Sequence, residues 1–320
     1  MHRRAFGILT GAALLASGAV LADTYPSRVV TIVVPFGAGS GSDTVARILS
    51  QHLASRLGQS VVVENRAGAT GAVAAAGVSR AAPDGYTLLL GTNSTHGSNS
   101  SLYKKINYDP IKDFEPVAYT GTFNQLLIVD PRLPIRSVKE LLLYGRDNPG
   151  KLSYAGGNAG GIVMAETFAR ESGTPLVKVP YRSNPAGLTD VIAGRVSLMF
   201  ADISSALGFV QAGTIRALAV TTKGRSELFP DLPTIDAEGV KGYDLASWTS
   251  LFAPVGTPKE IVERLNREVN AVLALPDVKA RLLTLGVETN TMSPADLATF
   301  VRSEAAKWAR LVREAGIEAE

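Results

Sequence analysis

Short apolar runs alternate with amphipathic stretches along most of the chain, which is the pattern of strands followed by helices. The first cycle is a β-branched run at 29–34, stopped by Pro35, and then a helical stretch that starts at Asp43. Uninterrupted apolar strands separated by helices are typical of a parallel sheet that is covered on both faces. The pattern therefore predicts an α/β fold with mostly parallel sheets.

The alternation runs through two successive sets of strands. Expected strands are 29–34, 60–63 and 86–90 in the first set, and 126–129, 152–155, 177–179, 196–200 and 215–220 in the second. Further helices are expected to begin near residues 137, 161, 184, 258, 276 and 294. A chain of 320 residues is near the useful limit of a single core, so two domains are expected. No long linker separates the sets, which favours domains joined by strands that pass out and back.

The first 22 residues are typical of an export signal. Arg3 and Arg4 precede an apolar run at 8–21, and Val20 and Ala22 place small side chains at the −3 and −1 positions of a cut after residue 22. The paired arginines fit a twin-arginine signal as well as an ordinary Sec signal, and the sequence leaves the route open. We expect a periplasmic protein whose mature chain begins at residue 23.

The net charge and the cysteine content argue against several kinds of partner and chemistry. Removing the signal takes away two of the 32 Lys and Arg and none of the 29 Asp and Glu, which leaves a net charge of +1. Such a balance gives no basic face for nucleic acid. The chain has no cysteine, hence no disulfide or thiol chemistry, and no cluster of His and Asp has metal-ligand spacing. No cofactor and no metal are expected.

The loop after the first strand is the strongest candidate site. Backbone N–H groups at the start of a helix attract anions, glycines allow close approach of a ligand, and serines add hydroxyl donors. The same serines and Asp43 also suit helix capping, with Ser42 or Asp43 as the N-cap. The candidate residues of this loop are Phe36, Gly37, Ala38, Gly39, Ser40, Ser42 and Asp43.

A dinucleotide fingerprint is the rival interpretation of this loop, with Glu64 at the end of the next strand as the ribose-binding acid. Position 42 is Ser where the third glycine of that motif belongs, and Pro35 interrupts the strand end. Export also disfavours a nicotinamide cofactor. Anion binding is therefore the preferred hypothesis.

Three further polar loops follow predicted strands. Ligands of open α/β sheets bind at the carboxyl ends of strands. Gly-rich, donor-rich loops in both sets of strands suit a ligand held from both sides of a cleft. The candidates are Thr92, Asn93, Ser94 and His96 in the second loop, Gly156, Gly157, Asn158 and Gly160 in the third, and the segment 179–184 in the fourth.

Catalytic residues are scarce. His96 is the only histidine in a candidate loop, and no G-x-S-x-G motif occurs. An exported hydrolase with His96 as the base remains an alternative, but we expect a binding protein with no catalytic residue.

These residues resemble the Bug family, the solute receptors of tripartite tricarboxylate transporters. The resemblance covers nearly the whole mature chain, and the order and spacing of its motifs carry it. The matching segments are 25–28 (YPSR), 34–39 (VPFGAG), 64–71 (ENRAGATG), 82–88 (APDGYTL), 148–152 (NPGKL), 179–181 (VPY), 218–221 (LAVT) and 252–258 (FAPVGTP).

The resemblance implies a two-domain type II periplasmic-binding-protein fold, the Venus flytrap, which closes on a small carboxylate and delivers it to membrane transporter subunits. Residues 23–123 plus 243–320 would form domain 1 and residues 124–242 domain 2. The loops 36–43 and 92–96 would form one jaw, and the loop 156–161 with Tyr181 and Asp202 the other. A monomer is expected, and a receptor that serves a signalling partner is an alternative.

One departure affects the expected ligand. Family members usually carry a Ser-rich start to the third loop and a hydroxyl near its end, where this chain has Gly156, Gly157 and Gly161. Fewer hydroxyl donors change the hydrogen bonds on offer, so the ligand's identity cannot be transferred from a relative.

Overall fold

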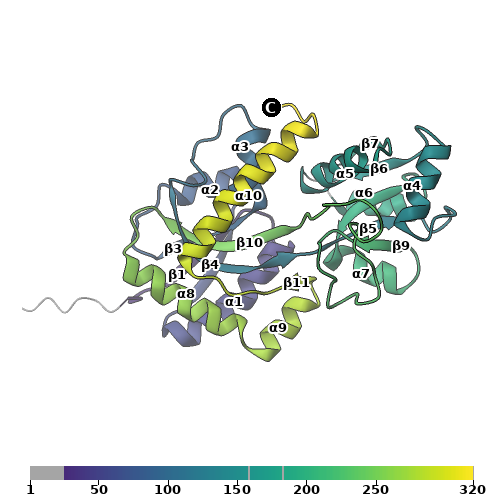
Figure 1. Ribbon diagram of the computed structural model, residues 1–320. Coiled ribbons are helices and arrows are strands. Elements are labelled where there is room, and N and C mark those ends of the chain that lie inside the picture. Colours follow the sequence, from purple (N-terminus) through teal and green to yellow (C-terminus); the bar gives the residue numbers. More distant parts are fainter. Residues whose placement is uncertain (1–24, 158, 182–183, 320) are drawn as a thin grey trace, which may run out of the picture.

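The computed structural model describes residues 25–157, 159–181 and 184–319, so the predicted export signal at 1–22 lies outside the described residues. Figure 1 shows two lobes, each built around one sheet with helices on its faces. Among the described residues, every helix is too short or too polar to cross a membrane.

The first sheet has six strands in the order β11–β4–β10–β3–β1–β2. Their bounds are Val30–Val34 (β1), Val61–Asn65 (β2), Thr87–Thr92 (β3), Phe114–Phe123 (β4), Ser247–Pro254 (β10) and Val287–Glu288 (β11). The helices of this lobe are Gly41–Leu57 (α1), Ala69–Gly71 (η1), Ala72–Val78 (α2), Ser94–Ser98 (η2), Asn99–Leu102 (α3), Lys259–Leu273 (α8), Pro276–Leu283 (α9) and Pro294–Glu314 (α10).

The second sheet has five strands in the order β7–β6–β8–β5–β9. Their bounds are Gln125–Val129 (β5), Ser153–Gly156 (β6), Val177–Pro180 (β7), Leu198–Asp202 (β8) and Arg216–Val220 (β9). The helices around it are Val138–Asp147 (α4), Ala159–Ser172 (α5), Asn184–Ile192 (α6) and Ile203–Gln211 (α7).

Alternate residues of the strands pack into separate hydrophobic cores on the two faces of each sheet. Ile32 and Val34 of β1 pack with α1 and α8, whereas Val33 packs with α2 and α10. In the second sheet, Leu127 and Val129 of β5 join the core under α4 and α5. The intervening positions of β5 join the core under α6 and α7. This two-sided burial explains why these strands are apolar at nearly every position.

Both sheets are mixed, whereas the sequence predicted mostly parallel sheets. β1 pairs in parallel with β2 and β3, and β6 pairs in parallel with β7 and β8. β10 runs antiparallel to β3 and β4, and β5 runs antiparallel to β8 and β9. The reason is topological: β4 leads straight into β5 without a crossover helix, and β10 carries the chain back.

The two connections between the sheets lie side by side. β4 and β10 pair from Ser247 opposite Phe123 to Pro254 opposite Phe114. The domain boundaries predicted at 123/124 and 242/243 stay a proposal, which the membership of the strands in the two sheets supports.

The last helix contributes to the cores of both lobes. Leu297 and Val301 of α10 pack with the first sheet, and Trp308 and Leu311 pack with the core that contains β5 and β8. Between them, Glu304 is 7% exposed, and its Oε2 accepts hydrogen bonds of 2.9 Å from the indoles of Trp248 and Trp308. One carboxylate thus satisfies two buried indole N–H groups.

We predict that Glu304→Met lowers the free energy of unfolding by about 2–4 kcal/mol, because it leaves two buried indole donors without an acceptor. Urea unfolding followed by circular dichroism measures the loss. Glu263→Met is the control, since Glu263 forms an exposed pair with Lys259 and its loss is expected to cost less than about 0.5 kcal/mol. Equal effects of the two changes would contradict the role assigned to Glu304.

Candidate functional site

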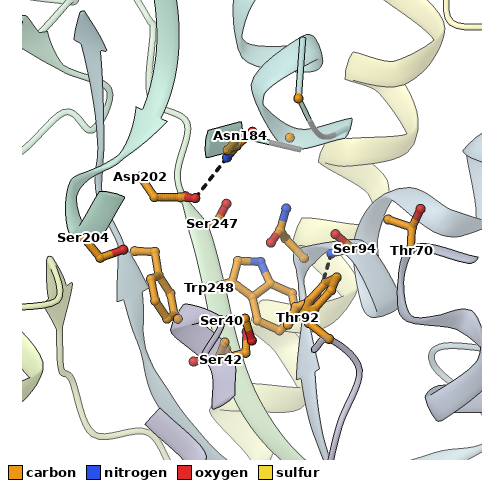
Figure 2. A pocket seen from close by; sticks show the side chains of 17 residues that line it. Ser40, Ser42, Thr70, Thr92, Ser94, Asn184, Asp202, Ser204, Ser247 and Trp248 are labelled. Atoms are coloured by element: carbon orange, nitrogen blue, oxygen red, sulfur yellow. Dashed lines mark hydrogen bonds between the residues drawn. The ribbon is translucent and has the colours of Figure 1, made fainter. Parts of the chain in front are cut away.

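A cavity of about 390 Å³ lies where loops from both sheets meet. One side is formed by the start of α1, the end of β3 and the paired ends of β4 and β10, and the other by the loops that follow β6, β7 and β8. Figure 2 shows Asp202 and Asn184 on the opposite side of the view from Ser40 and Ser42. The lining residues are Phe36, Ser40, Gly41, Ser42, Thr70, Thr92, Asn93, Ser94, Phe123, Gly157, Gly160, Asn184, Asp202, Ser204, Ser247, Trp248 and Thr249.

The start of α1 supplies hydrogen-bond donors to this cavity. The helix begins at Gly41, and helix geometry leaves the N–H groups of Gly41 and Ser42 without a carbonyl partner inside the helix. A side chain at residue 41 would crowd the Phe123 ring, because its Cβ would lie 2.9 Å from Cε1 of Phe123. The backbone can therefore come close to a bound group at the positive end of the helix.

A capping network fixes the loop that leads into α1. The N-cap is Ser40, two or three residues before the predicted Ser42 or Asp43, and its Oγ accepts from Asp43 N at 3.2 Å. Asp43 in turn accepts from the N–H of Gly39 at 2.9 Å, so the two side chains satisfy two donors reciprocally. Gly39 has a φ of +81°, a conformation that glycine adopts without strain.

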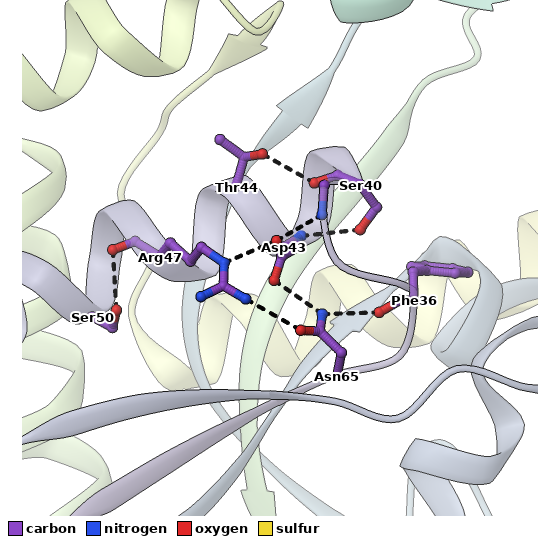
Figure 3. A network of polar contacts seen from close by, with 8 residues as sticks. Phe36, Ser40, Asp43, Thr44, Arg47, Ser50 and Asn65 are labelled. Carbon is purple, nitrogen blue, oxygen red and sulfur yellow. Dashed lines mark hydrogen bonds and ion pairs between the residues drawn. The ribbon is translucent and has the colours of Figure 1, made fainter. Parts of the chain in front are cut away.

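Asp43 faces this network rather than the cavity (Figure 3). It accepts from Arg47 Nε and from Asn65 Nδ2, each at 2.9 Å, and Asn65 also donates to the carbonyl of Phe36 at 3.0 Å. Burial raises the pKa of Asp43, but the hydrogen bonds from Arg47, Gly39 and Asn65 outweigh it and leave the pKa below its ordinary value. The carboxylate therefore ties the loop to α1 and β2.

Eight predicted site residues lie away from the cavity lining or outside the described part. Gly37, Ala38 and Gly39 are exposed on the loop, and Asn158 is not among the described residues. Gly156 is enclosed, since a Cβ there would lie 2.9 Å from Ile162. Tyr181 donates to Asp190 at 2.7 Å. Asp43 and His96 are also absent from the cavity lining.

His96 is buried in the core of the first lobe. Its side chain is fully buried, stacks on Phe252 with ring centroids 3.7 Å apart, and its Nδ1 lies 2.9 Å from the hydroxyl of Thr95. Burial lowers the pKa of His96 to about 3, so the imidazole is neutral at pH 7. Its place in a polar loop suggested a ligand contact, but the apolar packing that encloses it comes from strands elsewhere in the chain.

Nine predicted site residues do line the cavity: eight come from the first three predicted loops, and the ninth, Asp202, ends β8. They are Phe36, Ser40, Ser42, Thr92, Asn93, Ser94, Gly157, Gly160 and Asp202. The sequence pattern did not indicate Thr70, Phe123, Ser204, Ser247, Trp248 and Thr249, which also line the cavity. Gly41 and Asn184 were predicted only as members of the segments 36–43 and 179–184. The hydroxyl pattern at 247–249 was the one available signal, and without a predicted strand there it could not be placed.

Charge in the lining is confined to one carboxyl group. Among the described residues of the cavity, Asp202 is the only ionisable side chain apart from hydroxyls, and the others are neutral polar or aromatic. Nowhere in the described ranges do three or more His, Cys, Asp or Glu gather in a way that could hold a metal ion. The rival dinucleotide site loses its acid, because Glu64 is held by Arg66 at 2.6 and 2.9 Å and does not line the cavity.

We predict a specific acid sensitivity from Asp43. Its pKa is lower in the folded state than in the unfolded chain, so it stabilises the fold above the unfolded pKa of about 3.9, and this contribution is lost as the pH falls through the folded pKa. Wild type should therefore lose more thermal stability than Asp43→Asn between pH 6 and pH 3. The melting temperatures of both proteins are measured at pH 6 and pH 3. An equal fall in melting temperature for wild type and Asp43→Asn would refute this prediction.

Comparison with known proteins identifies the family. A family model described as the tripartite tricarboxylate transporter family receptor matches residues 45–317. BugT of Bordetella pertussis is 32% identical over 300 residues, covering 93% of this chain and 92% of BugT.

Solved structures agree with this result. A protein of R. palustris solved with adipate is 38% identical with a TM-score of 0.84, over 92% of this chain and all of that one. MatC of Rhodopseudomonas palustris with bound malate is 34% identical with a TM-score of 0.78, over 90% of this chain and all of MatC. These matches confirm the predicted two-domain α/β fold of periplasmic binding proteins. The chain belongs to the tripartite tricarboxylate transporter family of receptors, and the predicted relationship to the Bug proteins is confirmed.

Proposed function

We propose that this protein is a periplasmic solute receptor that captures a small carboxylate between its two domains and delivers it to a tripartite tricarboxylate-type transporter. The observation that carries the proposal is the cavity itself, in which the amino end of α1 meets hydroxyl groups from β3 and β10. Relatives of known structure hold adipate and malate, both dicarboxylates, which supports a carboxylate as the ligand.

The ligand's carboxylate is assigned to the amino end of α1. The unpaired N–H groups of Gly41 and Ser42 and the hydroxyls of Ser40 and Ser42 are donors, and the helix dipole favours negative charge there. Thr92, Asn93 and Ser94 extend this side of the site. The opposite jaw consists of Gly157, Gly160, Asn184, Asp202 and Ser204. Neutral donors give moderate affinity, which suits a receptor that must release its ligand.

A binding role is also favoured over catalysis. The proposed hydrolase needed His96 as a base, but this imidazole is enclosed by Phe114 and Phe252 and is absent from the lining. A general base must reach the proton that it removes. We therefore propose that the protein is not an enzyme, that it acts in the periplasm after removal of residues 1–22, and that it works as a monomer.

We predict that carboxylates, and not sugars or nucleotides, stabilise the mature protein in thermal-shift measurements after refolding to remove carried-over ligand. A ligand at 100 times its Kd adds about 2.7 kcal/mol, which is a shift of several degrees. A rise in melting temperature with sugars or nucleotides, but with none of the carboxylic acids, would contradict the carboxylate assignment.

We predict that Ser42→Asp abolishes this stabilisation while the protein stays folded. An acidic side chain in the first turn of α1 is favourable for the helix but repels an anionic ligand at the same place. Ser50→Asp is the matched control, since it adds the same charge to the same helix outside the cavity. Retained carboxylate binding in Ser42→Asp would place the ligand elsewhere.

A further inference from the structure

The jaw opposite α1 contains a carboxyl group whose hydrogen-bond donors, in the described part of the chain, are neutral amides. Asp202 ends β8, and its Oδ1 accepts from Gln125 Nε2 at 3.1 Å. Its Oδ2 accepts from Asn184 Nδ2 at 3.0 Å. Gln125 Nε2 is also 3.1 Å from Ser247 Oγ, so this amide donates to two groups. Each carboxyl oxygen thus has one neutral donor and keeps capacity for more.

The same amides leave acceptors without donors. Because their NH₂ groups face Asp202, their carbonyl oxygens face elsewhere. Asn184 Oδ1 and Gln125 Oε1 are buried, and neither has a hydrogen-bond partner within the described part of the protein. Gln125 is only 1% exposed. Buried polar groups are normally paired, so the free oxygen of Asn184, which lines the cavity, can accept a hydrogen bond from a ligand.

No positive side chain balances Asp202 among the described residues. It belongs to none of the ion pairs there, and the described lining contains no Lys, Arg or His. Burial raises the pKa of Asp202, because removing the carboxylate from water disfavours its charged form. An arriving cation would favour that form.

The two ends of the cavity therefore favour different chemical groups on a ligand. The α1 end offers backbone N–H groups and hydroxyls, whereas the opposite jaw, which also contains Gly157, Gly160 and Ser204, holds the negatively charged side chain of the described lining, Asp202 (Figure 2). A dicarboxylate suits the α1 end, but it has no hydrogen-bond donor for Asp202. Its second carboxylate would face Asp202, and two carboxylates that share a site cannot both be charged without a large cost.

We infer that the ligand of this receptor is an amino-carboxylate, with its carboxylate at the amino end of α1 and a primary ammonium group at Asp202. The inference rests on the proposed function. An ammonium group has three N–H donors, which match the free lone pairs of Asp202, and its charge offsets that of the carboxylate. Asp202 is then a specificity-determining residue that selects the zwitterion over the diacid.

Matched ligand pairs test the inference by isothermal titration of the refolded mature protein. The pairs are 4-aminobutanoate with succinate, 5-aminopentanoate with glutarate and 6-aminohexanoate with adipate. The two members of each pair have the same number of carbon atoms, and one end is CH2–NH3⁺ in the amino acid and COO⁻ in the diacid. We expect the best amino acid to bind at least about tenfold more tightly than its matched diacid, the size of one charge-assisted hydrogen bond.

The Asp202→Asn variant removes the negative charge of the side chain while keeping its size, so it tests whether that charge recognises the ligand. It should weaken binding of the amino acid by about tenfold or more and leave the affinity for the diacid unchanged or higher. Asp277→Asn is the control, since it removes the same charge from a side chain that is 71% exposed and outside the cavity.

Each outcome has one meaning. Diacids that bind as tightly as the amino acids, or equal losses for both series in Asp202→Asn, overturn the inference while the carboxylate receptor stands. Absence of binding by either series, with binding by sugars or nucleotides, overturns the proposed function itself.

Discussion

The antiparallel pairing of β4 with β10 is the constraint on which the rest of the structure depends. These strands are the only lengths of described chain that connect the two sheets, and they pair over their full length. Their ends also form part of the cavity, through Phe123, Ser247, Trp248 and Thr249. The part of the chain that sets the relation of the two lobes therefore also supplies one wall of the site.

Glu304 extends this constraint into α10. Its carboxylate accepts from Trp248, whose side chain lines the cavity, and from Trp308, which packs in the core that contains β5. A rigid wall follows, because the Trp248 ring is fixed by a hydrogen bond at one edge and by the Phe300 ring at 5.3 Å. A helix at the end of the chain thus orients a residue of the cavity without touching the ligand site.

Local sequence patterns predicted about half of the residues that line the cavity. Most of the others join it through pairing between strands that are distant in the sequence. Ser40 and Ser42 lie where the chain passes from β1 to α1, and Thr92 ends β3, so the strand-to-helix pattern alone places them at the carboxyl edge of a sheet. Ser247 and Trp248 could not be found in this way, since they join the site only because β10 pairs with a strand more than a hundred residues earlier. His96 failed for the same reason: Phe252 of β10 covers it.

The position of Asp43 explains how the amino end of α1 stays available to an anion. A carboxylate in the first helical turn would normally occupy the positive field there. Here the side chain is turned toward Arg47 and Asn65, with Arg47 compensating its charge (Figure 3). Gly41 and Ser42 line the cavity, and within the described ranges Asp202 in the opposite jaw has no such compensation. The two carboxylates thus take different roles, because Asp43 has a guanidinium partner, whereas the partners of Asp202 among the described residues are amides.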